Sequence, residues 1–437
     1  MLLYSTKNKN NQASLQEAVM KGLPDDNGLY MPEHIPSLNP EFIQNLANYS
    51  FLEIAHEVCS TLFGTTIPDA DLQKILANSI DFPAPVVKLD EQKFILELFH
   101  GPSLAFKDFG ARFMAQLMSY FNQGADKELT ILVATSGDTG GAVAAGFYKT
   151  PGIRVVILYP SGKVSMLQEK QLTTLGHNIS ALEINGTFDD CQAMVKQAFL
   201  DKELTQKIRL SSANSINIAR LIPQSFYYFE AFKQLPKNGD PVVFCVPSGN
   251  FGNITAGLLA IKMGLPVHHF IAATNANYVV PEYIASGKYQ SRPSVPTLSN
   301  AMDVGNPSNF ARMIDLYLGE DECSTWNNLK DQISGYAFDD AKTAEIMQLV
   351  DQKYNYTLDP HGAVGYLALE AYQEKHPNTR GVILETAHPA KFMDDVERIL
   401  GHQIDVPERL ADLADREKKA DFLEAEYGAL KRRLMAK

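Results

Sequence analysis

The chain has 437 residues, of which 45% are hydrophobic and 10% aromatic, a composition typical of a well-packed globular protein. One hydrophobic core rarely organises so many residues, so two or three lobes are expected. The net charge of −12 and the scattered basic residues argue against a nucleic-acid-binding protein, and no apolar run is long enough to cross a membrane. The four cysteines lack paired spacing and the start lacks a signal-peptide pattern, so we expect reduced thiols in a cytoplasmic protein.

Residues 1–93 mix turn signals with two helical patterns, at Glu41–Asn48 and Phe51–Phe63. From Phe94 onward, apolar runs alternate with helical stretches, which is the pattern of βαβ units and parallel sheets. The expected strands are Phe94–Phe99, Leu129–Ala134, Arg154–Leu158, Ile179–Ile184, Ile208–Leu210, Val242–Val246, His269–Ala273 and Val382–Glu385. We therefore predict an α/β fold of two open, mostly parallel-sheet lobes with a cleft between them, preceded by an N-terminal α+β region.

Two segments interrupt this alternation. Lys288–Thr297 is rich in Pro and Ser and is predicted to be a loop. The segment from Val406 is highly charged, with apolar residues at roughly helical spacing at Leu410, Leu413, Phe422, Leu423 and Leu430. This spacing predicts a partly solvated C-terminal helix packed on the protein, and a partner-binding helix is the alternative.

The stretch His100–Gly110, HGPSLAFKDFG, places Lys107 in the first turn of an expected helix just after a strand. A helix N-terminus already carries partial positive charge, and Phe106 and Phe109 flank the lysine. Both effects favour loss of the ammonium proton, which an amine must lose before it forms a Schiff base with an aldehyde cofactor. An ordinary solvated lysine at a helix start is the alternative.

Two glycine-rich loops follow buried strands. Ala134–Ala142, ATSGDTGGA, and Pro247–Asn253, PSGNFGN, each lead into an expected helix, where outward-facing N–H groups and the helix dipole favour an anion. Neither has the lysine of a Walker loop or the spacing of a dinucleotide-binding loop. One can hold a cofactor phosphate, helped by the amides of Asn250 and Asn253, and the other a substrate carboxylate. A capped turn without a ligand is the alternative for each.

A third segment, ILETAHPAKF from Ile383 to Phe392, also follows a buried strand. The hydroxyl of Thr386 can hydrogen-bond an unprotonated pyridine nitrogen at that strand end. His388 and Lys391 are candidate acid–base groups. A capped turn before a helix from Phe392 is the alternative for both.

Six motifs, in the order HGPSLAFKDFG, TSGDTGGA, NSINIARLIPQ, PSGNFGN, DPHGAVGY and LETAHPAKF, resemble the threonine synthase family. The opening LYSTKN and the following SLQEAVMKGLPDDNGLYMPEHIP resemble the start of that family's bacterial and fungal branch. The resemblance covers nearly the whole chain. It implies a lyase of the tryptophan synthase β superfamily, fold type II, with pyridoxal 5'-phosphate in the cleft between the lobes. The implied reaction, the last step of threonine biosynthesis, converts O-phospho-L-homoserine and water into L-threonine and phosphate.

The resemblance also implies roles for individual residues. Lys107 matches the Schiff-base lysine and is expected to move protons between the reacting carbons, and Thr386 matches the partner of the pyridine nitrogen. Asp138, where many relatives of the wider fold have Asn, is assigned to the cofactor's phenolic oxygen. The loop around the cofactor phosphate comprises Gly249, Asn250, Phe251, Gly252 and Asn253. The turn that faces the substrate carboxylate comprises Ser136, Gly137 and Thr139.

The substrate phosphate needs cationic or hydroxyl donors near the cleft. The candidates are Ser161, Lys163, Asn214, Ser215 and Arg220, and for Lys163 and Arg220 a solvated helix charge is the alternative. The predicted domains are an N-terminal region of residues 1–93, a large cofactor-binding domain of residues 94–125 and 220–437, and a small α/β domain of residues 126–219. The family branch implies a monomer. No metal is predicted, because His56 and Cys59 have no second pair of ligands.

Three other functions remain open. A serine/threonine dehydratase or another β-eliminating lyase shares the fold but does not turn O-phosphohomoserine into threonine and phosphate. A catalytically silent relative that binds the cofactor or a phosphorylated ligand as a sensor would lack the absorbance of a lysine-bound cofactor. A nucleotide-binding module would need a lysine or a glycine spacing that neither loop has.

Overall fold

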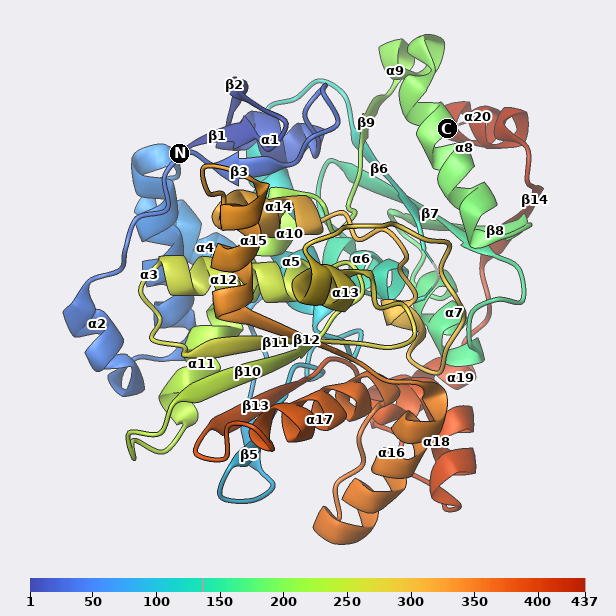
Figure 1. The fold of residues 1–437 in the computed structure, drawn as a ribbon. Helices are drawn as coiled ribbons and strands as arrows, with labels where there is room; N and C mark the ends of the chain where they lie inside the picture. The colour runs from blue at the N-terminus through green and yellow to red at the C-terminus, as the bar shows by residue number, and fades with distance from the viewer. Residues whose placement is uncertain (136, 437) are drawn as a thin grey trace.

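The computed structural model describes residues 1–135 and 137–436, whose strands form sheets of three, six and five strands (Figure 1). The two larger sheets are parallel except for one antiparallel edge strand. The predicted α/β fold of two mostly parallel sheets with a small N-terminal region is therefore confirmed. Among the described helices, none combines the length and apolar character that a bilayer crossing requires.

The N-terminal region pairs three strands in the antiparallel order β2-β1-β3. They are β1 (Leu2–Ser5), β2 (Asn8–Ser14) and β3 (Tyr30–Pro32). The helices are α1 (Leu15–Lys21), α2 (Pro40–Gln44), α3 (Phe51–Phe63) and α4 (Asp69–Ser79), with short 3-10 turns η1 (Leu46–Asn48) and η2 (Gly64–Thr66). The helix predicted at Phe51–Phe63 is confirmed as α3. It starts at Phe51 because Ser50 and Glu53 form a reciprocal capping box there. The helix predicted at Glu41–Asn48 is instead divided at Asn45 into α2 and η1.

The six-stranded sheet has the order β12-β11-β10-β13-β5-β4, with β4 antiparallel at the edge. Its strands are β4 (Val86–Lys88), β5 (Lys93–Glu97), β10 (Val242–Pro247), β11 (His269–Thr274), β12 (Ile333–Ala337) and β13 (Arg380–Glu385). Every residue of β10, β11 and β13 is buried, as expected for strands that helices cover on both faces.

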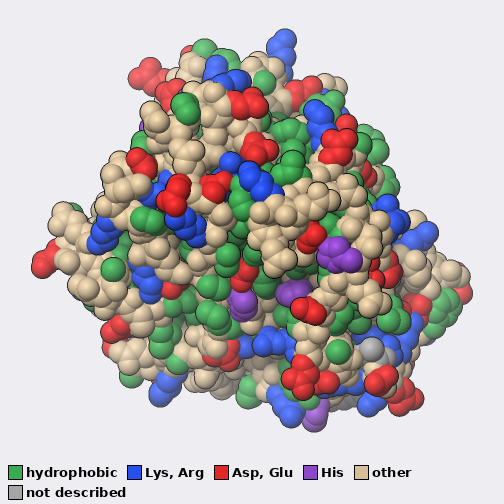
Figure 2. All heavy atoms as spheres, turned by 90° about the horizontal axis from the view of Figure 1, so that it is seen from below, with side chains coloured by type: hydrophobic (Ala, Val, Ile, Leu, Met, Phe, Trp, Pro, Cys, Tyr) green, Lys and Arg blue, Asp and Glu red, His purple; other side chains and the backbone are tan. Residues whose placement is uncertain are grey.

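Helices and short 3-10 turns surround this sheet. They are α5 (Lys107–Phe121), α10 (Ile218–Leu221), η3 (Ile222–Ser225), α11 (Phe226–Gln234), α12 (Gly252–Lys262), α13 (Val279–Ser286), η4 (Asn300–Met302), α14 (Phe310–Leu316), α15 (Glu322–Gln332), α16 (Asp340–Tyr354), α17 (Pro360–Gln373), η5 (Pro389–Phe392) and α18 (Met393–Leu400). Figure 1 shows α17 running alongside β13, and α17 contacts β10, β11 and β13. Acidic and basic side chains are intermixed over the face seen in Figure 2.

The five-stranded sheet is wholly parallel, in the order β14-β8-β7-β6-β9. Its strands are β6 (Leu129–Ala134), β7 (Ile153–Pro160), β8 (Ile179–Asn185), β9 (Arg209–Ser211) and β14 (Ala420–Glu424). The helices around it are α6 (Asp138–Phe147), α7 (Met166–Thr173), α8 (Phe188–Leu200), α9 (Lys202–Lys207), α19 (Glu408–Ala414) and α20 (Tyr427–Met435). Helix α5 packs against α6, so it joins the two sheets.

The prediction of one C-terminal helix from Val406 is wrong. The segment forms α19, then β14, then α20, and β14 adds a parallel edge strand to β8. Phe422, read as part of a helical face, lies in β14 with 57% of its surface exposed. Two strands lie outside the domains predicted for them. Strand β14 belongs to the five-stranded sheet, although the predicted boundaries put it in the large domain. Strand β4 belongs to the six-stranded sheet, although the predicted boundaries put it in the N-terminal region.

Candidate active site

Lys107 is the first residue of α5, and the loop before it is bonded to the segment after β13. The Phe106 N–H donates to the Thr386 carbonyl at 2.9 Å, and the His388 N–H donates to the Leu104 carbonyl at 3.0 Å. The predicted site residues Lys107 and Thr386, which are distant in sequence, are thereby held on adjoining backbone segments.

The side chain of Lys107 is only 17% exposed, and its Nζ lies 4.0 Å from Oδ2 of Asp138. Burial lowers the pKa of Lys107 to about 8; Asp138 opposes this shift, whereas the cations of Lys391 and Arg220 reinforce it. This direction agrees with the predicted readiness of the lysine to lose its proton. The flanking Phe106 and Phe109 indicated burial, but the two distant basic residues are not visible in the local sequence.

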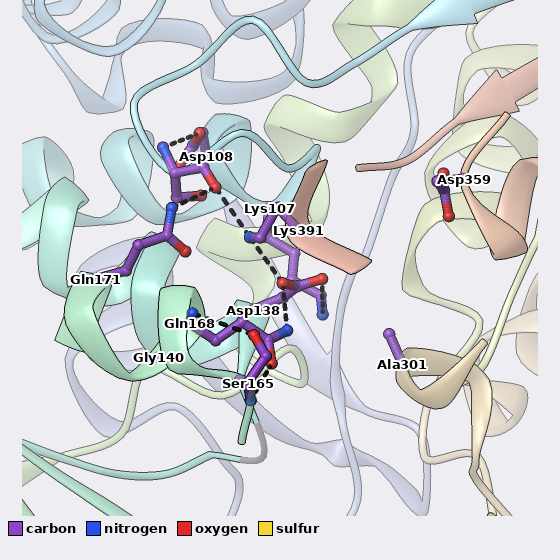
Figure 3. A network of polar contacts seen from close by, with 12 residues as sticks. Lys107, Asp108, Asp138, Gly140, Ser165, Gln168, Gln171, Ala301, Asp359 and Lys391 are labelled. Carbon is purple, nitrogen blue, oxygen red and sulfur yellow. Dashed lines mark hydrogen bonds and ion pairs between the residues drawn. The ribbon is translucent and has the colours of Figure 1, made fainter. Parts of the chain in front are cut away.

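Asp138, the first residue of α6, lies between Lys107 and a second buried lysine (Figure 3). Lys391 of η5 places its Nζ 2.7 Å from Oδ1 of Asp138 and donates to the Ser103 carbonyl at 2.9 Å. Gln168 of α7 donates to the same Oδ1 at 3.1 Å. Burial by itself would raise the pKa of Asp138, but Lys391 and Lys107 together hold it below its ordinary value, so the carboxylate is ionised.

The glycine-rich turn before α6 is held by Thr135. Its Oγ1 accepts from the N–H groups of Gly137 at 3.1 Å and Gly140 at 2.8 Å. Gly137 has φ of +144°, and a Cβ there would lie 2.7 Å from the Gln168 side chain, so only glycine fits. Thr139 is half-buried, and Ser136 lies outside the described residues. The substrate-carboxylate roles of these residues stay predictions.

The second loop, Gly249–Asn253, is tightly backed by the rest of the protein. A Cβ on Gly249 would lie 2.5 Å from the Ala301 carbonyl, so a larger residue would displace that backbone. Phe251, buried and left-handed at φ 60°, occupies the N-cap position of α12 and makes no side-chain cap there. Within residues 1–135 and 137–436, the N–H groups of Gly249, Asn250 and Phe251 have no acceptor. The loop thus directs free donors at the positive end of a helix, where an anion binds.

The two asparagines of this loop have different partners. Asn250 Nδ2 donates to Ser215 Oγ at 2.6 Å, which brings a predicted cofactor residue against a predicted substrate residue. Asn253 Nδ2 instead donates to the Pro247 carbonyl at 2.8 Å, and its Oδ1 accepts from Ser248 Oγ at 2.8 Å. The Asn253 amide is bonded within the loop and stabilises its shape.

At the end of β13, Thr386 is buried, and its hydroxyl has no hydrogen-bond partner in the described chain. His388 caps η5 by accepting the Ala390 N–H at Nδ1, 3.1 Å away, and burial lowers its pKa to about 4. Of the two readings of His388, the capped turn is the one that the structure supports. Lys391 is not part of that cap, because it is bonded to Asp138.

Among the candidate phosphate ligands, Arg220 in α10 is buried and lies close enough to Lys107 to lower its pKa. Arg220 Nη1 donates to the Ala213 carbonyl at 2.7 Å, and its Nε has no acceptor among the described residues. The alternative of a solvated helix charge is wrong for Arg220. Asn214 and Ser215 are half-buried in the same loop, so these three candidates lie together.

Ser161 and Lys163 lie in the loop after β7 and are not part of this group. Ser161 Oγ donates to Glu183 at 2.7 Å, and Glu183 also pairs with Lys418 at 2.6 Å. Lys163 is exposed. The acidic neighbour of Ser161 disfavours a phosphate there, so the assignment of this pair stays a prediction with little local support.

Four residues near Asp138 and its turn were not predicted to have their observed roles: Thr135, Gln168, Lys391 and Ser103. Thr135 has a local signal, since a Thr before a Ser-Gly turn can accept the turn's N–H groups. Gln168 and Lys391 come from other elements, and nothing in their own segments indicates a contact with Asp138.

The donors and acceptors of the site fit pyridoxal phosphate. A buried amine of lowered pKa suits its aldehyde. N–H groups at the start of α12 and the Thr386 hydroxyl, which have no partner among the described residues, suit its phosphate and its ring nitrogen. These three features lie at the carboxyl ends of strands of one sheet or in the loops that follow them, which is the usual ligand-binding edge of a parallel sheet.

Three family models match the chain: Threonine synthase N terminus at residues 3–80, Pyridoxal-phosphate dependent enzyme at 81–386, and Threonine synthase, C-terminal at 362–433. The threonine synthase of Escherichia coli (strain K12) is 46% identical over 436 residues, which cover 100% of this chain and 99% of that protein. The threonine synthase of Saccharomyces cerevisiae is 37% identical over an aligned region that covers 94% of this chain and 92% of that protein.

Solved structures agree. The structure of pyridoxal-phosphate-bound threonine synthase from Brucella melitensis has a TM-score of 0.94 at 36% identity, with 99% of this chain and 98% of that chain covered. The E. coli threonine synthase structure has a TM-score of 0.91 at 46% identity, with 100% and 99% covered. The chain belongs to the threonine synthase family of pyridoxal-phosphate-dependent enzymes.

Proposed function

We propose that this chain converts O-phospho-L-homoserine and water into L-threonine and phosphate, with pyridoxal phosphate attached to Lys107. Membership of the family supports the reaction. The observation that carries the role of Lys107 is its position: a buried amine of pKa about 8, on a segment bonded to Thr386 and 4.0 Å from Asp138.

The residues that would hold the cofactor come from three segments. Lys107 attaches its aldehyde, the N–H groups of Gly249–Asn253 bind its phosphate, and Thr386 donates to its ring nitrogen. The side chain of Asn250 orients the phosphate loop through Ser215. Asp138 lies beside Lys107 as an ionised carboxylate, so it can accept but not donate a hydrogen bond at the phenolic oxygen.

Bound pyridoxal phosphate supplies an electron sink for the negative charge that develops beside the substrate amine. Lys107 is the group we assign to proton transfer at the α- and β-carbons before phosphate leaves, and at the γ- and α-carbons afterwards. A pKa of about 8 suits both removal and return of these protons, because the amine takes up and releases a proton near neutral pH. Water adds at the β-carbon.

The substrate's two anionic groups would bind to two different segments near Lys107. Arg220 offers a buried cation with an unpartnered N–H, and Asn214 and Ser215 line the same loop, so we assign them to the phosphate. Gly137 and Thr139 are assigned to the carboxylate. Ser161 and Lys163 remain weaker candidates for the phosphate.

We also infer a monomeric, cytoplasmic protein. The described cysteines are free, and Cys59, Cys191 and Cys245 are buried, which suits a reducing compartment. The monomer is supported by the resemblance to the bacterial and fungal branch. Size-exclusion chromatography with light scattering tests it, and a mass of twice the 48.4 kDa chain would contradict it.

Two experiments test the proposed function. Borohydride reduction of the pyridoxal-phosphate-loaded protein, followed by peptide mapping, should label Lys107 and no other lysine. The purified protein should release phosphate and threonine in equal amounts from O-phosphohomoserine. A protein that releases no phosphate from O-phosphohomoserine but forms a 2-oxo acid from serine or threonine would be a β-eliminating lyase. A protein without lysine-bound cofactor would favour the sensor.

A further inference from the structure

Asp138 is one buried carboxylate that faces two lysine side chains. Lys391 lies at 2.7 Å from Oδ1, whereas Lys107 stays 4.0 Å from Oδ2 (Figure 3). The closer lysine is Lys391, which sequence reasoning offered only as a candidate acid–base group. The pairing is therefore unequal, and the residue proposed to carry the cofactor has the looser contact.

The tight contact is built from several elements. Lys391 has a side chain only 1% exposed, and it also donates to the Ser103 carbonyl in the loop before α5. Gln168 donates to the same oxygen of Asp138 from α7. Oδ1 of Asp138 is thus occupied twice, and only Oδ2 is left on the side of Lys107. Moving a buried ammonium away from two acceptors costs free energy, because the charge would lose its partners without gaining water.

We propose that Lys391 is a positioning residue: by holding Asp138 through Oδ1, it prevents this carboxylate from closing on Lys107 and keeps the Lys107 amine free to react. The inference rests on the proposed attachment of pyridoxal phosphate to Lys107. Its physical basis is competition, since a carboxylate that directly paired with Lys107 would stabilise the ammonium and withdraw the neutral amine.

Other charged groups also face the three residues of this contact. Lys107 faces Arg220 of α10 in addition to Asp138 and Lys391, and Arg220 also favours the neutral amine. Asp138 is further influenced by His361 of α17. On α5 itself, Asp108 faces Lys391, Arg112 and Arg220, and its Oδ2 accepts the Ser103 N–H at 2.8 Å.

The test measures the pKa of the Lys107 amine directly and does not depend on catalytic activity. Full-length protein stripped of cofactor is pulse-labelled with acetic anhydride from pH 6 to 10, and mass spectrometry of the Lys107 peptide gives the pKa of that amine. Lys391→Met should raise this pKa by at least one unit, which lowers labelling at pH 7 about tenfold. Lys391→Arg, the matched control, keeps the charge and should label within about threefold of wild type.

A double variant separates competition from simple structural damage. With Asp138→Asn and Lys391→Met together, no carboxylate remains to close on Lys107, so labelling should return to within about threefold of wild type. The double variant removes Lys391 and its carboxylate partner together, and it carries the test if Lys391→Met does not fold. An unchanged or lowered pKa in Lys391→Met, or a tenfold loss of labelling in the double variant, would overturn the proposal.

These outcomes are distinct from a failure of the proposed function. Acetylation reports the proton affinity of Lys107 whether or not the cofactor attaches there. Borohydride labelling of another lysine would refute the attachment site and leave the competition between Lys391 and Lys107 measurable. Thermal denaturation of each variant shows that the labelled protein is folded.

Discussion

The lowered pKa of Lys107 predicts how the rate of cofactor attachment depends on pH. Only the neutral amine attacks an aldehyde, and a pKa of about 8 leaves roughly 10% of Lys107 neutral at pH 7 and about 90% at pH 9. An ordinary lysine would be roughly 0.04% and 4% neutral at these two values. Attachment to Lys107 should therefore rise about tenfold between pH 7 and pH 9 and then level off.

The assay is reconstitution of stripped, full-length protein with excess pyridoxal phosphate. The visible absorbance of the lysine-bound cofactor gives the rate constant at each pH, and a free lysine derivative is measured in parallel to show the pH dependence of an ordinary lysine. Lys107→Ala is the control and should give no stable attachment at any pH. A rate that still rises tenfold per pH unit between pH 8 and pH 10 would refute the lowered pKa.

The same pKa links stability to pH. The folded-state value lies below the unfolded value, so between about pH 8 and 10.4 the unfolded chain binds the additional proton, and the contribution of Lys107 to the free energy of unfolding rises with pH. Below pH 8 the buried cation costs the folded protein about 3 kcal/mol. Urea unfolding of wild type and Lys107→Met over this range should show a slope in the wild type that the variant lacks, and parallel curves would contradict the assignment.

Three further predictions concern the rest of the site. Arg220→Met should raise KM for O-phosphohomoserine about 10- to 100-fold, the range expected for a lost charged hydrogen bond, and should retain cofactor absorbance. An unchanged KM would show that Arg220 does not bind the substrate phosphate. Gly249→Ala should weaken cofactor binding at least tenfold in equilibrium dialysis, since its Cβ would lie 2.5 Å from the Ala301 carbonyl, and wild-type affinity would mean that this loop does not hold the phosphate. Leu410→Ala should lower the urea-unfolding free energy by about 2–5 kcal/mol, because the side chain is 1% exposed, and a loss under about 1 kcal/mol would show that the position can repack.

Central strands could be predicted closely because they are buried on both faces. Leu129–Ala134 is observed with the predicted bounds, and Val242–Val246 is one residue longer in the structure. The edge strands β12 and β14 could not be predicted in this way. Their sequences, ISGYA and ADFLE, contain few consecutive apolar residues, and pairing with a neighbour decides their conformation.

The site shows the same division between local and tertiary information. Lys107, Thr386 and the Gly249–Asn253 loop lie at strand ends or helix starts, and each has a local pattern that predicts its position. The contact of Lys391 with Asp138 joins two elements around different sheets, so no spacing within either segment indicates it. The orientation of Asn253 depends on a hydrogen bond inside its own loop, which also has no signal in residue type.

The C-terminal segment bears on the site through a small apolar cluster. Leu410 of α19 packs with Leu104, Leu167 and Ala390, which come from the loop before α5, from α7 and from η5. Arg409 Nη1, beside Leu410, donates to the Gly101 carbonyl at 2.8 Å. Helix α19 therefore packs on three segments that are far apart in sequence, on the path of the chain from the six-stranded to the five-stranded sheet.

Each of those three segments also carries one polar residue of the site within three positions of its apolar contact: Lys107 after Leu104, Gln168 after Leu167, and Lys391 after Ala390. Apolar packing in a close-packed cluster is rigid, so it sets where these polar groups stand. An ion pair alone would draw both lysines onto Asp138, because Coulomb attraction grows as the distance falls. The cluster around Leu410 thus anchors the backbone segments from which Lys391 reaches Asp138 at 2.7 Å and Lys107 reaches it at 4.0 Å.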